Sequence, residues 1–117
     1  MSNIVLLAED DPVTRFYIDN IISNHGVHVL PAKDGEEAIE LYRNNNVDLI
    51  ITDLYMPHIN GFDFISYVRQ EDQETPIIVI SSYYDKLFEL NIQHFIRKPV
   101  DYNIIIAIVN ALVKNSN

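Results

Sequence analysis

Cysteine is absent from this chain of 117 residues, so disulfide bonds and thiolate metal sites are excluded. Basic residues are scarce, with 8 lysines and arginines against 17 acidic residues and a net charge of −9. That balance repels nucleic acid and anionic lipid, so we expect no direct nucleic-acid binding. No apolar run is long enough to cross a bilayer, and no basic stretch with an apolar tail resembles a signal peptide. We therefore expect a cytoplasmic location.

Apolar residues make up 48% of the sequence, which suits one compact domain with its own core. We expect a single domain over residues 1–117, with a polar tail from about Lys114. Short apolar runs indicate five buried strands, and the central one, rich in β-branched residues, has the pattern of a strand buried on both faces. The expected strands are Asn3–Ala8, Val27–Leu30, Asp48–Asp53, Ile77–Ile80 and His94–Arg97.

Helical patterns alternate with these strands. Helix-capping signals precede or open four of the helical segments, at Asp11, Asp34, Asn60–Gly61 and Asp101. A fifth segment, around Asp85–Leu90, is long enough for two helical turns at most. The order βαβαβαβαβα with right-handed crossovers predicts a doubly wound parallel sheet with helices on both faces.

Charged and polar residues stand where the predicted strands end. The first strand ends at Glu9–Asp10, the central strand at Asp53, the fourth strand at Ser81 and the last at Lys98. In an open α/β sheet, ligands bind beyond the carboxyl ends of the strands. We therefore expect these side chains to converge at one edge of the sheet.

Three acids and one lysine in one pocket leave negative charge uncompensated. Two carboxylates about 4 Å apart repel by roughly 4 kcal/mol at an effective dielectric constant near 20. Lys98 offsets one of the three charges, and a small divalent cation with oxygen ligands, most plausibly Mg²⁺, fits the remaining deficit. Without such a cation, at least one of these carboxyl groups is expected to titrate abnormally high.

These residues resemble a known family, the receiver domain of bacterial two-component response regulators. The motifs lie in the right order at different strand ends, and the resemblance covers the chain from Ile4 to about Leu112. They are Glu9–Asp10, Asp53, Met56–Pro57, Asn60–Gly61, Ser81, Phe95 and Lys98–Pro99. The resemblance implies a flavodoxin-like (βα)5 sheet with strand order 2-1-3-4-5.

The resemblance also implies a role for each residue of the pocket. Asp53 would accept a phosphoryl group from a phosphohistidine on a histidine kinase or a histidine phosphotransfer protein. Lys98 and Ser81 would bind phosphoryl oxygens, and Phe95 would change rotamer as Ser81 moves. Such a chain is a signalling domain rather than an enzyme, although it promotes its own phosphorylation and dephosphorylation. Its output partner or effector domain stays open.

For the metal, the resemblance implies that Asp10, Asp53 and the backbone carbonyl of Tyr55 bind Mg²⁺ directly, with Glu9 acting through a water molecule. It implies a cis peptide bond between Lys98 and Pro99. Bulky Tyr55 and Tyr83 follow Asp53 and Ser81 by two residues, where side chains control access of water to the phosphoryl group. We therefore expect slow autodephosphorylation.

The chain departs from the family between its last two strands. Only residues 82–97 separate Ser81 from Lys98, several fewer than receivers normally have, so a shortened fourth helix is expected. On the first helix, Phe16 lies on the mostly polar side, where it is a possible partner contact, although isolated exposed aromatics are common.

Other interpretations remain open for the residues and for the whole chain. Glu9–Asp10–Asp11 could be a capping cluster, which for Asp11 is the favoured role, and Phe95 could be plain core. A pseudo-receiver, which binds partners without phosphate, is the alternative function. A nucleotide- or flavin-binding sheet is disfavoured, because acids stand where a glycine-rich loop would follow the first strand.

Overall fold

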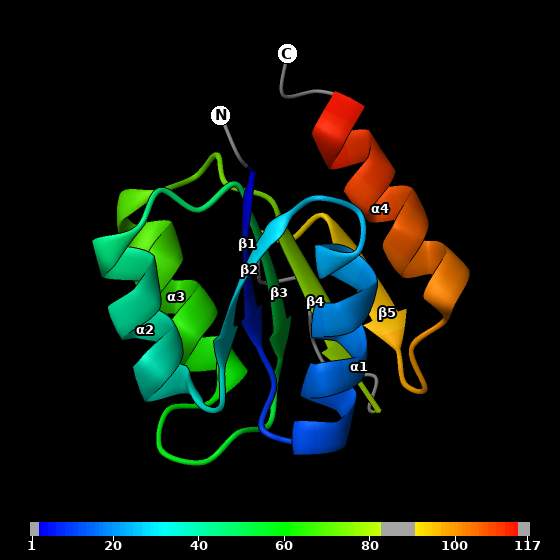
Figure 1. The fold of residues 1–117 in the computed structure, drawn as a ribbon. Helices are drawn as coiled ribbons and strands as arrows, with labels where there is room; N and C mark the ends of the chain where they lie inside the picture. Colours follow the sequence, from blue (N-terminus) through cyan, green and yellow to red (C-terminus); the bar gives the residue numbers. More distant parts are fainter. Residues whose placement is uncertain (1–2, 83–90, 115–117) are drawn as a thin grey trace.

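The structure, a computed structural model, describes residues 3–82 and 91–114. The strands are β1 (Ile4–Ala8), β2 (His28–Ala32), β3 (Leu49–Asp53), β4 (Ile77–Ser81) and β5 (His94–Arg97). The helices are α1 (Pro12–Ser23), α2 (Gly35–Asn44), α3 (Gly61–Glu71) and α4 (Tyr102–Lys114). Figure 1 shows strands and helices alternating from β1 to β4, as the sequence pattern predicts, and β5 is the next described element after β4.

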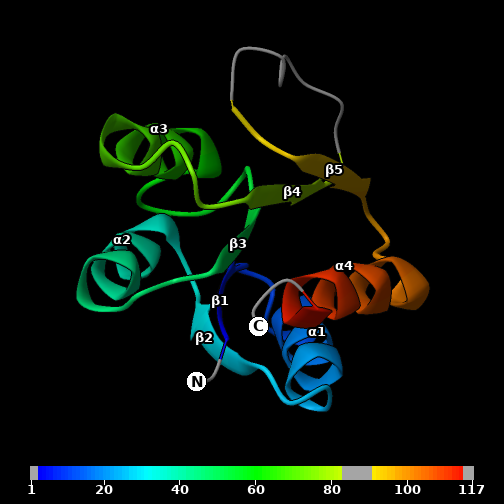
Figure 2. The same ribbon diagram turned by 90° about the horizontal axis from the view of Figure 1, so that it is seen from above.

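All five strands are parallel and follow the order β2-β1-β3-β4-β5. Seen from above, α2 and α3 cover one face of the sheet, and α1 and α4 cover the other (Figure 2). The predicted doubly wound sheet and its strand order are therefore confirmed. The expected short helix around Asp85–Leu90 falls outside the described residues.

The central strand β3 is buried along its whole length. Successive side chains of a strand point to opposite faces, so β3 divides its apolar residues between two cores. Leu49 and Ile51 pack in the core with α1 and α4, whereas Ile50 packs in the core with α2 and α3. This burial on both faces explains why the strand has a nearly continuous apolar run rather than an alternating one.

Side-chain caps fix where three helices begin. The carboxylate of Asp11 accepts hydrogen bonds from the backbone N–H (3.0 Å) and the hydroxyl (2.6 Å) of Thr14. Asp34 and Asn60 accept bonds from the N–H groups three residues further on, at the starts of α2 and α3. Helix capping, the role favoured for Asp11 from the sequence, is therefore confirmed.

The predicted boundaries of the second strand were wrong. It was expected at Val27–Leu30, but β2 runs from His28 to Ala32 and includes Pro31. Proline lacks an N–H and suggests a strand end, yet β2 lies at the edge of the sheet, where one side of the strand has no neighbour to bond. The edge position therefore tolerates Pro31.

The carboxyl ends of all five strands meet at one edge of the sheet, which we call the carboxyl edge. At the opposite edge, β1 begins and α4 ends (Figure 1). In the part of the chain that the structure describes, no helix combines the length and the apolar character needed to span a membrane.

Candidate functional site

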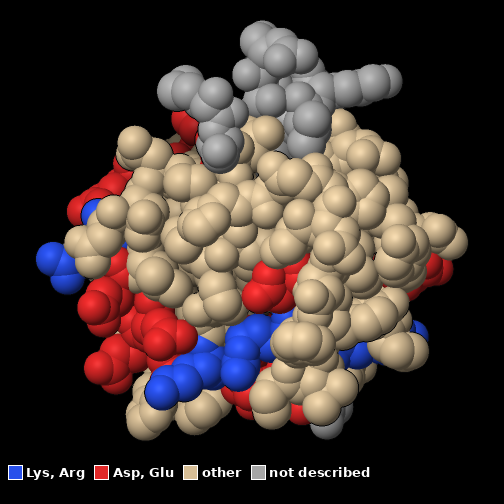
Figure 3. All heavy atoms as spheres, in the orientation of Figure 1, with Lys and Arg blue, Asp and Glu red and all other residues tan. Residues whose placement is uncertain are grey.

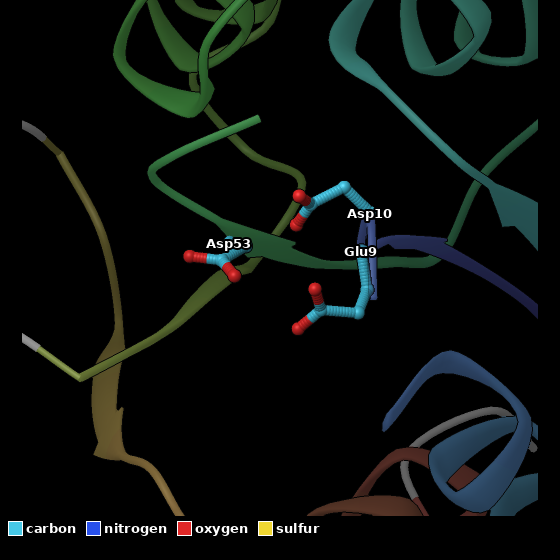
Figure 4. Close-up of side chains that lie close together, drawn as sticks. All are labelled: Glu9, Asp10 and Asp53. Carbon is cyan, nitrogen blue, oxygen red and sulfur yellow. The ribbon is translucent and has the colours of Figure 1, made fainter. Parts of the chain in front are cut away.

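Strand register brings the acidic residues together at the carboxyl edge. Ala8 of β1 pairs with Thr52 of β3, so the next residues, Glu9 and Asp53, stand level with each other. One carboxylate oxygen from each of Glu9, Asp10 and Asp53 lies within 4.8 Å of the others. Figure 4 shows all three carboxylates in the space beyond the ends of β1 and β3. The predicted convergence of the three acids is thus found.

Both oxygens of the Asp53 carboxylate have fixed partners. Oδ1 accepts hydrogen bonds from the backbone N–H groups of Leu54 (2.7 Å) and Tyr55 (3.3 Å). Oδ2 accepts a bond of 2.6 Å from the ammonium group of Lys98. Asp53 is only 5% exposed, so these contacts hold its carboxylate in one orientation with little competition from water.

Lys98 is shared between two carboxylates from different strands. Its Nζ lies 2.6 Å from Asp53 Oδ2 and 2.6 Å from Glu9 Oε1. Burial lowers the pKa of Lys98, but the contacts with Asp53 and Glu9 outweigh burial and raise it. The backbone N–H of Lys98 donates to the carbonyl of Ser81, and the Lys98–Pro99 peptide bond is cis. The ammonium group therefore enters the pocket from the end of β5.

Glu9 is fully buried. Its Oε2 accepts a hydrogen bond from the N–H of Asp11 (2.9 Å), whereas Oε1 faces Lys98 without a hydrogen bond of ordinary geometry among the described residues. Burial, with the nearby charge of Asp53 and a contact with Asp10 adding to it, raises the pKa of Glu9 from 4.5 to about 7. The expectation of one abnormally high carboxyl pKa is confirmed, although burial rather than charge repulsion is its largest cause.

The oxygen donors of this pocket fit a small hard cation. Three carboxylates provide the ligand type that Mg²⁺ prefers, and the buried Oε1 of Glu9, 2.6 Å from Lys98 Nζ, is one of their oxygen donors. Asp10 is the exposed member of the three, so the cluster is open to solvent on its side. The pocket therefore has both the charge and the access that a divalent cation needs.

The other residues singled out from the sequence surround this pocket at different depths. Ser81 is fully buried at the end of β4, and half-buried Phe95 packs against the core on the α2 and α3 side. Tyr55 is 46% exposed and makes an edge-to-face contact with Phe62 on α3. Phe16 on α1 is 71% exposed, and its partner role stays a prediction. Tyr83 lies outside the described residues.

Gly61 lets the chain pass close to Asp53 as it turns into α3. A Cβ atom at Gly61 would lie 2.0 Å from the backbone oxygen of Asp53. We expect Gly61→Ala to lower the free energy of unfolding by about 2–3 kcal/mol in urea denaturation, because backbone atoms would have to shift. Gly26→Ala is the control: Gly26 has a φ of +80° and open space around it, so strain of only about 1 kcal/mol is expected. Equal losses would contradict the steric explanation.

Arg15 is a residue of this region that the sequence did not single out. Its Nη1 donates to the backbone carbonyls of Glu9 (2.8 Å) and Asp10 (3.3 Å). The available signal was its spacing, since a residue in the second turn of the helix that follows an acidic pair can reach back to it. Arginine is usually solvated, however, so the sequence alone gave no reason to choose it.

Comparisons with known proteins agree with this geometry. The family model described as "Response regulator receiver domain" matches residues 5–110. The chain is 33% identical over 101 residues to Regulator of RpoS from Escherichia coli (strain K12), covering 82% of this chain and 30% of that protein. It is 29% identical over 115 residues to Response regulator RR06 from Streptococcus pneumoniae, covering 94% of this chain and 52% of that protein. The chain thus spans about half or less of these relatives.

A solved structure of a receiver domain has the same fold as this chain. The receiver domain of the Francisella response regulator 1452 superposes with a TM-score of 0.88 at 27% identity, covering 99% of this chain and 100% of that one. The sheet order, the acidic cluster at its carboxyl edge and the match over residues 5–110 all lead to one assignment. This chain belongs to the response regulator receiver domain family of two-component signalling systems.

Proposed function

We propose that this receiver domain is a phosphorylatable switch in which Asp53 accepts a phosphoryl group from a phosphohistidine. The donor is a histidine kinase or a histidine phosphotransfer protein. The observation that carries the proposal is the 2.6 Å contact between Asp53 Oδ2 and the Lys98 ammonium, with Glu9 and Asp10 clustered beside them. Phosphoryl transfer needs a carboxylate held in one orientation beside a positive charge, with other carboxylates nearby that can bind a metal ion.

In the transfer step, an oxygen of Asp53 forms a bond to phosphorus while the bond from phosphorus to the donor imidazole nitrogen breaks. The electron pair of that bond returns to the imidazole. The transition state is loose and in line, so the protein contributes mainly by positioning and by neutralising charge. The two N–H groups that hold Asp53 Oδ1 supply the positioning, and Lys98 supplies a positive charge.

Asp10, Asp53 and the backbone carbonyl of Tyr55 are the groups that would hold Mg²⁺ directly, with Glu9 acting through a water molecule. When bound, Mg²⁺ neutralises charge on the phosphoryl oxygens. The contact between Lys98 and Asp53 lies beside these carboxylates, and the exposed carboxylate of Asp10 faces solvent.

The response to phosphorylation is a shift between two arrangements of the β4 and β5 ends. A phosphoryl group adds about −1.5 to −2 charge and three acceptor oxygens to Asp53. Ser81 and Lys98, at the ends of β4 and β5, are the groups that would move toward those oxygens, and half-buried Phe95 lies on β5. Such movement biases a surface between two states rather than making a new fold.

Phosphorylation is tested with acetyl phosphate and Mg²⁺, followed by intact mass spectrometry. We expect the mass of one phosphoryl group to be added to the wild type and not to Asp53→Ala. Asp63→Ala, which removes an exposed carboxylate from α3, is the matched control and should be labelled like the wild type. Absence of an adduct with acetyl phosphate and with a cognate kinase would favour the pseudo-receiver alternative.

Tyr55 is expected to slow hydrolysis of the phosphoaspartate. Its half-exposed ring rests against Phe62 near Asp53, where it restricts the approach of water. Tyr55→Asn should therefore shorten the phosphoaspartate half-life several-fold, measured as release of inorganic phosphate after removal of the donor. Tyr102→Asn, at a tyrosine of similar exposure on α4, serves as the control. An unchanged half-life in Tyr55→Asn would show that this ring does not shield the phosphoaspartate from water.

A further inference from the structure

The acidic pair at the end of β1 is held by the helix that follows it. Arg15, in the second turn of α1, reaches back so that its Nη1 donates to the carbonyl oxygens of Glu9 (2.8 Å) and Asp10 (3.3 Å). Its own backbone N–H donates to the carbonyl of Asp11 (2.9 Å). One residue thus contacts three successive carbonyl groups of the turn between β1 and α1.

Other bonds close the rest of this turn. The N–H of Glu9 donates to the carbonyl of Ala32, and the N–H of Asp11 donates to Glu9 Oε2. The carboxylate of Asp11 is engaged by Thr14 at the start of α1. The guanidinium of Arg15 thus places a full positive charge against the carbonyls of both Glu9 and Asp10.

We propose that Arg15 is a positioning residue for the cation site formed by Glu9, Asp10 and Asp53. By binding the two carbonyls, its guanidinium fixes the peptide planes from which the side chains of Glu9 and Asp10 project. Asp10 is the exposed member of the cluster and depends most on such support. Groups that orient metal ligands from behind commonly contribute 10–100-fold to metal affinity. The proposal rests on the proposed function, since it assumes that the pocket binds Mg²⁺.

A positioning role and a simple charge effect predict opposite results. If Arg15 acted only as a nearby positive charge, removing that charge would tighten binding of a divalent cation, and lysine would substitute fully. If Arg15 positions the turn, its removal weakens binding in spite of the lost repulsion. Lysine then restores little, because an ammonium group cannot reproduce the planar fork of a guanidinium.

The test is isothermal titration of the full chain with Mg²⁺, free of any phosphoryl donor, for the wild type, Arg15→Lys and Arg15→Gln. We expect Arg15→Gln to weaken Mg²⁺ binding roughly tenfold and Arg15→Lys to weaken it less, but measurably. Arg43→Gln, in the last turn of α2, removes the same charge at the opposite edge of the sheet and should bind like the wild type. Urea midpoints of all variants, taken without Mg²⁺, show whether each is folded.

Three results would overturn this proposal while leaving the proposed function intact. Tighter or unchanged Mg²⁺ binding by a folded Arg15→Gln would do so, as would wild-type affinity in Arg15→Lys. Weakening by Arg43→Gln equal to that by Arg15→Gln would do so as well, because it would show that the effect is not specific to the turn after β1. Failure of the wild type itself to bind Mg²⁺ would overturn the proposed function together with this inference, so the two failures are distinguishable.

Discussion

Replacing Lys98 by alanine is expected to lower the free energy of unfolding of the metal-free protein by about 3 kcal/mol at neutral pH. The ammonium group lies 2.6 Å from both Glu9 and Asp53, whose side chains are 0% and 8% exposed. Without it, two nearly buried carboxylates face each other with no counter-charge. Protonation of Glu9, whose pKa is already raised to about 7, limits the loss.

The loss in Lys98→Ala should shrink when Mg²⁺ is added. Without the ammonium group that repels a cation, the variant is expected to bind Mg²⁺ more tightly than the wild type and so to gain more stability by mass action. Urea denaturation with EDTA and with Mg²⁺ measures both quantities. Lys33→Ala, which removes the same charge from an exposed position at the end of β2, is the control and should change stability little. If Lys98→Ala matched Lys33→Ala in EDTA, Lys98 would not be a structural counter-charge in the pocket.

Glu9 is expected to make the metal-free protein less stable as the pH rises from about 4.5 to 7. Its pKa is 4.5 in a solvated chain and about 7 in the fold, chiefly because the carboxyl is buried. The folded state therefore binds more protons than the unfolded state in this range, so the free energy of unfolding falls as pH rises. A shift of this size corresponds to about 3 kcal/mol across the window.

Urea unfolding at several pH values in EDTA tests this dependence. Glu9→Gln has no titratable group at this position. Its free energy of unfolding should therefore change less between pH 4.5 and 7 than that of the wild type, and it should be more stable than the wild type at pH 8. Glu40→Gln, at an exposed position on α2, should keep the wild-type slope. Mg²⁺ is expected to offset the loss in the wild type more than in Glu9→Gln. A wild-type slope that survived in Glu9→Gln would assign the pH dependence to another group.

The sheet could be predicted from the sequence because each strand is marked by a short local pattern of residues. The strands β1, β3 and β4 are short apolar runs buried on both faces, and a polar residue marks the end of each: β3 and β4 end at Asp53 and Ser81, and Glu9 follows β1. Parallel strands share one carboxyl edge, so Glu9, Asp53 and Lys98 could be placed together without coordinates. The boundary of β2 was missed because a strand can continue through Pro31 only if it is an outer strand of the sheet. Which strand is outermost is a property of the tertiary structure.

The sequence could not predict how atoms pair within the pocket. That Lys98 bridges Glu9 and Asp53, rather than contacting Asp53 alone, depends on strand register and on the length of the glutamate side chain. The contacts of Arg15 depend on how α1 leaves the β1 end, which one residue's identity does not specify. Likewise, repulsion predicted a raised pKa for at least one of the three carboxyl groups without naming which, whereas at Glu9 full burial, which composition does not show, is the main cause.

The distribution of charge over the surface is uneven. Figure 3 shows acidic side chains gathered on the α2 side of the view, at the left, whereas the surface over α1 is mainly uncharged. The large apolar side chains that α1 exposes are Val13, Phe16 and Tyr17.

The start of β1 and the end of α4 lie on the same side of the molecule, opposite the carboxyl edge (Figure 1). A biotin tag or fluorescent reporter joined at either end would project away from the acidic pocket. Chains captured on a sensor chip through such a tag would present the pocket to the flowing solution. The fold therefore lends itself to real-time kinetic measurements of donor docking with the protein immobilised by either end.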